Sequence, residues 1–113
     1  MDTREFVTRG IRFAHVVKGQ ELGHAYLYLM QNDLHKEPFG FVEDVFVDKE
    51  SRGQGIGDAL MEAVLWRAKE EQCYKLIANS RNDGSRAGVH VWYERLGFRK
   101  YGTEFRLDFS LPV

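Results

Sequence analysis

Residues 41–60 read FVEDVFVDKESRGQGIGDAL, and this stretch decides the predicted fold. Its first seven residues are dense in aromatic and β-branched side chains, which favours a strand in the interior of a sheet. Beyond the glycines, Ile56, Leu60 and Val64 recur at helical spacing and predict an amphipathic helix. The stretch therefore predicts a strand, a glycine-rich loop and a helix in succession.

Three glycines, at positions 53, 55 and 57, alternate where this helix is expected to begin. Glycine costs a helix about 1 kcal/mol relative to alanine, so three at one N-terminus need a physical reason. Anion binding supplies one, because the first helical turn has unpaired N–H groups and missing side chains let a phosphate approach. Arg52 adds a positive charge. A tight strand-to-helix turn explains the glycines equally well.

Two familiar nucleotide-binding motifs fail on the details of this loop. A P-loop continues with Gly-Lys-Ser or Gly-Lys-Thr, whereas Gly57 is followed by Asp58-Ala59. A dinucleotide-binding fold has G-x-G-x-x-G and an acidic residue at the end of the next strand. Here the spacing is G-x-G-x-G, and the next expected strand is followed by Asn79-Ser80. Neither nucleotide hydrolysis nor dinucleotide binding is predicted.

The remaining sequence predicts five further elements and their turns. These are a hairpin of residues 10–18 and 22–30 with a turn at 18–20, a loop at 31–38, a strand at 75–78, a helix at 87–96 ending at Gly97, and a closing strand at 101–109. The order β-β-β-α-β-α-β predicts an α/β (α+β) fold: a mixed, mostly antiparallel sheet with two main helices packed on it.

Length and composition limit the classes of function. A chain of 113 residues is expected to form one domain, residues 1–113. With 16 Lys and Arg against 17 Asp and Glu, it lacks the basic surface of a nucleic-acid-binding protein. No apolar run reaches the roughly 20 residues of a membrane span, and MDTREFVTRG lacks a signal-peptide core, so a cytoplasmic location is expected.

The metal-ligating and thiol side chains predict no metal site. The four histidines are dispersed, without a pair at the i, i+4 spacing of a helical metal site. The single cysteine, Cys73, cannot form an internal disulfide, and we expect it to be a buried structural thiol.

Three stretches in the right order resemble the GNAT superfamily of acetyltransferases. Arg52, Gly55 and Gly57 match its pyrophosphate loop, residues 41–47 resemble its fourth strand, and residues 92–98 (WYERLGF) resemble its tyrosine helix and following Gly-Phe. The similar region runs from about residue 41 to 98, roughly half the chain. The resemblance implies a short form of the GNAT-like acyl-CoA N-acyltransferase fold, with a truncated N-terminus.

The activity that this resemblance implies is transfer of an acetyl group from acetyl-CoA to a primary amine of a small molecule or protein. The amine would attack directly in a ternary complex. The cosubstrate would lie between separating strands, with its pyrophosphate on the loop and its thioester carbonyl on a main-chain N–H of the fourth strand. The implied cofactor-binding residues are Val45, Phe46, Val47, Arg52, Gly53, Gln54, Gly55, Ile56, Gly57 and Asp58.

Two residues are implied as catalytic. Tyr93 matches the family tyrosine that protonates the departing thiolate; packing beside Trp92 is the alternative role. Glu43 is the candidate general base, because strand alternation would place it on the face of Val45 and Val47. A solvated or ion-paired carboxylate explains Glu43 equally well.

The sequence departs from the family pattern at two places. Arg86 stands where many members have an asparagine, and it would bind an anion or cap a loop. Only about ten residues precede Ile11, where members usually have a strand and two helices. We therefore expect an open acceptor site and a homodimer. A non-catalytic module that binds acetyl-CoA or CoA is the alternative function.

Overall fold

A computed structural model describes residues 1–80 and 87–110 of the chain. The chain divides into two compact units, Met1–Ala78 and residues 79–113, and each is described by itself below.

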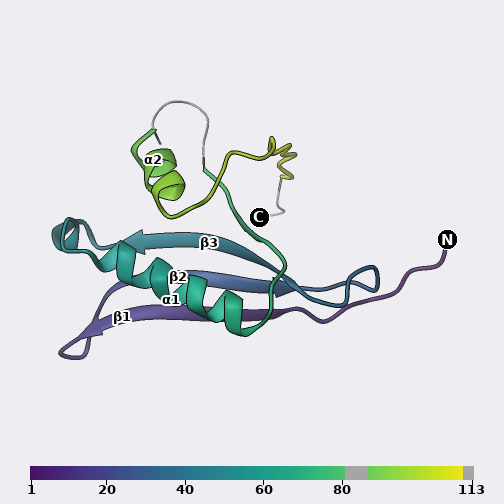
Figure 1. Cartoon of the computed structure of the whole chain (residues 1–113), viewed down its shortest axis with the longest axis horizontal. Helices are drawn as coiled ribbons and strands as arrows, with labels where there is room; N and C mark the ends of the chain where they lie inside the picture. Colours follow the sequence, from purple (N-terminus) through teal and green to yellow (C-terminus); the bar gives the residue numbers. More distant parts are fainter. Residues whose placement is uncertain (81–86, 111–113) are drawn as a thin grey trace. The chain divides into compact units, whose positions relative to one another are not determined.

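The first unit contains a four-stranded sheet in the order β1-β2-β3-β4. Figure 1 labels β1, β2 and β3. β1, β2 and β3 pair antiparallel, and β4 pairs parallel to β3. The strands are β1 (Arg9–Val17), β2 (Gln20–Met30), β3 (Phe39–Val47) and β4 (Leu76–Ala78). The predicted mixed, mostly antiparallel sheet is confirmed, as is the loop at residues 31–38.

The β1–β2 hairpin closes through two residues with left-handed backbone. Val17 pairs with Gln20, and between them Lys18 has φ 50° and Gly19 has φ 78°. Two positive φ angles are what a type I′ turn requires, and its twist matches that of the flanking strands. The turn predicted at residues 18–20 is confirmed.

Helix α1 (Ile56–Glu70) lies across one face of β1, β2 and β3 (Figure 1). Burial of the apolar side chains between helix and sheet is the main favourable term in folding this unit. The buried core consists of Ala25, Leu27, Leu29, Val42, Ile56, Leu60, Met61, Val64 and Ala68. The apolar residues that predicted this helix therefore form its packed side.

Gly23 lets α1 approach the sheet closely near the start of the helix. A Cβ at this position would lie 2.8 Å from the Phe46 carbonyl oxygen and 3.2 Å from side-chain carbons of Ile56 and Leu60. The carbonyl belongs to the backbone and cannot turn aside as the end of a flexible side chain could. The absence of a side chain at residue 23 therefore fixes how the end of β3 and the beginning of α1 pack together.

Cys73, predicted to be buried, is half-buried after the C-terminus of α1, where its N–H donates to the Ala68 carbonyl at 3.0 Å. Burial raises the pKa of the Cys73 thiol, and the charge of Glu71 adds to the effect. A thiol with a raised pKa is a poor nucleophile at neutral pH, which agrees with a structural role.

The second unit contains α2 (Ala87–Arg95), which ends in a Schellman motif. Gly97 has φ 103° and donates its N–H to the Glu94 carbonyl at 3.0 Å. The Phe98 N–H donates to the Tyr93 carbonyl, also at 3.0 Å. The predicted glycine cap is confirmed, and it fixes the chain around Tyr93.

The strand predicted at residues 101–109 is wrong. Residues 101–110 have no regular secondary structure and are exposed. Alternation of Phe105, Leu107 and Phe109 can form a strand only where a neighbouring strand pairs with the backbone. No described strand pairs with this segment, and its ion pair, Arg106 with Asp108, is local and exposed.

We expect Gly23→Ala to lower the free energy of unfolding by about 1–3 kcal/mol, because the added methyl group overpacks a backbone carbonyl. Gly102→Ala is the matched control, since no atom lies within 4 Å of its added Cβ. Urea unfolding of both variants measures the effect. Equal midpoints for the two variants would show that the close approach at residue 23 is not needed.

Candidate active site

The pairing of β3 with its parallel neighbour stops halfway along β3. It pairs with β4 only at Gly40, Phe41 and Val42, and β4 ends at Ala78. Among the described residues, no strand pairs with this edge of β3 from residue 43 to 47. Main-chain groups on that edge can therefore form strand-like hydrogen bonds with an extended ligand.

Hydrogen-bond polarity shows which amides face this edge. The Asp48 N–H donates to the Leu22 carbonyl of the β2 side at 2.9 Å. Because successive amides of a strand point to opposite sides, the Phe46 N–H also points toward β2. The N–H groups of Val45 and Val47 then point toward the unpaired edge. Of the three residues predicted to hold a thioester carbonyl by their backbone, these two are the suitable donors.

A β-bulge interrupts β3 next to Glu43. His24 pairs with Phe46 but Tyr26 pairs with Glu43, so β3 has one residue more than β2 in this interval. Asp44 has φ 52°, in the left-handed region. The extra residue reverses the alternation of faces. The prediction that Glu43 shares a face with Val45 and Val47 is therefore wrong: Glu43 shares the face of Phe46.

The glycine loop has left-handed backbone at two of its three glycines. Gly53 has φ 81° and Gly55, the N-cap of α1, has φ 80°. An added Cβ would meet no atom within 4 Å at either position, so backbone conformation and not crowding calls for glycine. This surface is open to a ligand.

The amides at the start of α1 suit an anion. The first helical bond runs from the Ala59 N–H to the Gly55 carbonyl at 3.0 Å. Within residues 1–80 and 87–110, nothing accepts a hydrogen bond from the N–H groups of Gly55, Ile56 or Gly57. These donors lie at the positive end of the helix dipole. The loop therefore fits a pyrophosphate group, with residues 52–58 around it.

Arg52 connects this loop to the end of β3. Its Nε donates to the Val47 carbonyl at 3.1 Å, and its guanidinium lies 5.8 Å from the centre of the Phe46 ring. No carboxylate in the described part of the chain pairs with Arg52. Its charge is available to an anionic ligand.

Tyr93 lies on α2 in the second unit, half-buried between two aromatic rings. Its ring centre is 5.3 Å from that of Trp92 and 5.4 Å from that of Phe98. One turn earlier, the Nε2 atom of His90 is buried, and no described residue forms a hydrogen bond with it. Arg86, whose role the sequence left open, lies outside the described residues.

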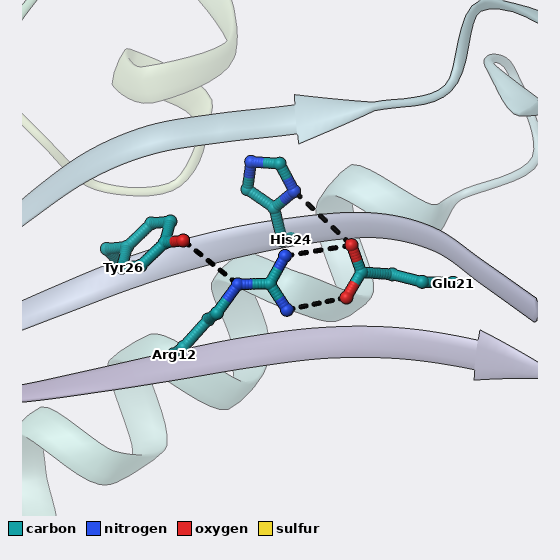
Figure 2. Close-up of polar contacts among 4 residues, drawn as sticks. All are labelled: Arg12, Glu21, His24 and Tyr26. Atoms are coloured by element: carbon teal, nitrogen blue, oxygen red, sulfur yellow. Dashed lines mark hydrogen bonds and ion pairs between the residues drawn. The ribbon is translucent and has the colours of Figure 1, made fainter.

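A polar network that the sequence did not predict lies on β1 and β2 (Figure 2). Arg12 donates two hydrogen bonds to the Glu21 carboxylate, at 2.5 and 2.8 Å, and its Nε donates to the Tyr26 hydroxyl at 3.0 Å. His24 Nδ1 lies 3.6 Å from the same carboxylate. A bulge in β2 between Glu21 and Gly23 places Glu21 on this face. No pattern in the sequence predicts this bulge.

The ion pair keeps both partners charged at neutral pH. Hydrogen bonding to Arg12 lowers the pKa of Glu21, and hydrogen bonding to Glu21 raises the pKa of Arg12. Because the Glu21 pKa is lowered on folding, any stability from the pair is present at neutral pH and is lost as pH falls through that pKa.

The described residues contain no group of three or more metal-ligating side chains. They also contain no helix long and apolar enough to cross a membrane.

The family model described as "Acetyltransferase (GNAT) domain" matches residues 10–100 of this chain. A model that covers this much of the sequence defines the class of protein. The chain belongs to the GNAT family, and the expected family and fold are confirmed.

Named relatives are similar over most of this chain. Glucosamine 6-phosphate N-acetyltransferase of Trypanosoma brucei brucei is 33% identical over 85% of this chain and 63% of its own length. Aminoglycoside N(6')-acetyltransferase type 1 of Stenotrophomonas maltophilia is 30% identical over 84% of this chain and 61% of its own. A solved Trypanosoma brucei acetyltransferase superposes with a TM-score of 0.75 at 31% identity, covering 90% of this chain and 69% of the other. The chain thus spans less than two thirds of these two curated relatives.

We expect Gly55→Ala to weaken CoA binding roughly tenfold, because alanine disfavours the left-handed N-cap by about 1–2 kcal/mol and would redirect the loop amides. Gly19→Ala is the matched control: Gly19 has φ 78°, open space around it and a place in the hairpin turn. Calorimetric titration of CoA into both variants measures the effect. Equal losses of affinity would refute the assignment of the loop to the cofactor.

Proposed function

We propose that this chain is an acetyl-CoA-dependent N-acetyltransferase that acts on a primary amine. The observation that carries the proposal is the unpaired edge of β3 next to a loop whose glycines hold amides at a helix N-terminus. The two curated relatives support it, since both are named as N-acetyltransferases of amino-group-bearing sugars or aminoglycosides.

Binding of acetyl-CoA is assigned to main-chain groups of the first unit. The pyrophosphate is proposed to bind residues 52–58, where Arg52 supplies charge and the N-terminal amides of α1 supply donors. The thioester carbonyl is proposed to accept hydrogen bonds from the N–H groups of Val45 or Val47. The same donors would stabilise the negative charge that develops on this oxygen during transfer.

The chemistry requires removal of two protons from the ammonium, protonation of the departing sulfur and one exchange of bonds. Glu43, exposed on β3, is proposed to accept a proton from the substrate ammonium, which frees the nitrogen lone pair. The new N–C bond forms at the acetyl carbon, the C–S bond breaks and the second proton of the nitrogen passes to solvent. Tyr93 is proposed to donate its hydroxyl proton to the departing sulfur and to recover a proton from solvent. One amide, one thiol and one net proton are released for each ammonium consumed.

A homodimer, a cytoplasmic location and a single-domain organisation remain predictions from the sequence.

The experiment that tests the activity measures release of free thiol from acetyl-CoA with a panel of primary amines. Release that depends on an amine supports the transferase. Thermal stabilisation by CoA without release for any amine would favour the non-catalytic binding module, because a ligand that binds the native state raises its apparent stability. If CoA does not stabilise the chain and no amine causes thiol release, both functions are excluded.

In the same assay, Tyr93→Phe is expected to lower kcat by about 10²-fold, the lower range for loss of a general acid. CoA affinity should stay within about twofold, because the phenyl ring retains the contacts with Trp92 and Phe98. An unchanged kcat would remove Tyr93 from the mechanism.

Glu43→Gln is expected to abolish the acidic limb of the kcat/KM profile against pH, because the amide cannot accept the substrate proton. Asp44→Asn is the matched control, since Asp44 is the adjacent exposed carboxylate. If Glu43→Gln leaves the profile unaltered, another base or water performs this step.

A further inference from the structure

The sheet face opposite α1 carries three cross-strand rows of side chains. The register of β1, β2 and β3 aligns Gly10, Tyr28 and Phe41 in one row, Arg12, Tyr26 and Glu43 in the next, and Ala14, His24 and Phe46 in the third. The middle row is polar from end to end. Its last member is the proposed base.

The guanidinium of Arg12 already forms hydrogen bonds with other side chains on this face. The Glu21 carboxylate occupies its two terminal nitrogens, and the Tyr26 oxygen occupies Nε. Two parallel hydrogen bonds to a carboxylate are the strongest arrangement a guanidinium forms with a side chain. The only arginine or lysine in the three rows is therefore neutralised and held in place (Figure 2).

Tyr26 is oriented by this contact to act as a donor. Its oxygen accepts from Arg12, so its own hydroxyl hydrogen is left to donate in another direction. Glu43 lies directly across from Tyr26 on β3, and no cation in the described part of the chain pairs with its carboxylate. One hydroxyl donor and one carboxylate acceptor thus lie side by side on a half-exposed surface.

We propose that Tyr26 and Glu43 bind the acceptor, and that the acceptor is an amine with hydroxyl groups and without a phosphate, as in an unphosphorylated amino sugar. The Tyr26 hydroxyl donates to an acceptor oxygen and Glu43 takes the ammonium. Arg12 and Glu21 act as positioning residues. This inference rests on the proposed transferase activity.

Charge on the described part of this face disfavours a phosphate. A phosphorylated amine gains little from Arg12, whose charge is matched by Glu21, and it is repelled by the carboxylates of Glu43 and Asp44. Arg52 lies over Phe46 of this face and is assigned to the pyrophosphate. Glu21 is consequently the residue that determines specificity.

Glucosamine and glucosamine 6-phosphate differ only in the phosphate and are the probes of choice. The kcat/KM of the wild-type chain should be at least about tenfold higher for glucosamine than for glucosamine 6-phosphate. This difference is expected when the phosphate lacks one charged contact. Glu21→Gln leaves Arg12 uncompensated and should raise kcat/KM for the phosphorylated probe roughly tenfold. A wild-type preference for the phosphate ester, or a ratio that Glu21→Gln does not change, would overturn the proposal.

Tyr26→Phe should raise KM for glucosamine roughly five- to tenfold, the loss expected for one hydrogen bond, while KM for acetyl-CoA and kcat stay within about twofold. Tyr28→Phe is the control, because Tyr28 stacks beside Tyr26, with ring centres 6.3 Å apart, whereas the hydrogen bonds of Arg12 go to Tyr26 and Glu21. Equal behaviour of the two variants would exclude Tyr26 from acceptor binding.

A binding measurement separates this inference from the activity on which it rests. Titration of glucosamine into the wild-type chain with CoA present should shift the NMR signals of the Tyr26 ring, and Tyr26→Phe should weaken the binding. Transfer to amines without such a shift would overturn the acceptor site and leave the transferase intact. Absence of both transfer and shift would overturn both.

Discussion

The close approach of α1 to the sheet at Gly23 is the constraint on which the candidate site depends. Residue 23 lies against the Phe46 carbonyl of β3 and against Ile56 and Leu60 of α1, so the end of one element and the beginning of the other share a single contact. The loop from Asp48 to Gly55 must span this fixed interval. Left-handed backbone at Gly53 and Gly55 lets it turn within that distance while its amides remain exposed.

Two β-bulges determine which side chains meet on the sheet face opposite α1, called the open face below. One in β2 places Glu21 with His24, and one in β3 places Phe46 with Glu43. Without the first, the strict alternation of a strand would turn Glu21 away from Arg12. Bulges are common beside functional sites because they redirect side chains without breaking the sheet. Here they align a cation, a phenol and a carboxylate across three strands.

The order of elements from residue 9 to residue 97 could be predicted from the sequence because local signals decide it. Helical spacing gave α1, the glycine at 97 gave the end of α2, and aromatic and β-branched residues gave β3. The prediction for residues 101–109 was wrong because alternation of apolar and polar side chains does not form a strand without a strand to pair with. The prediction of the sheet face on which Glu43 lies was wrong, because a bulge shifts the register without leaving a signal in composition. The network around Arg12 depends on the register of β1 with β2 and on the bulge in β2, which spacing along the chain does not reveal.

The loop and the open face differ in the charge that they offer to a ligand, and this difference follows from the residues that form them. The loop offers backbone amides at the positive end of α1 and the charge of Arg52, which no described carboxylate neutralises, so it attracts an anion. On the face, the guanidinium of Arg12 is matched by Glu21, while the Glu43 carboxylate has no described cation beside it. The proposed ternary complex needs this contrast, because its cosubstrate would carry the phosphates and its acceptor would arrive as an ammonium. If Arg12 were unpaired, the face would compete with the loop for anions and would repel the ammonium that Glu43 is proposed to deprotonate.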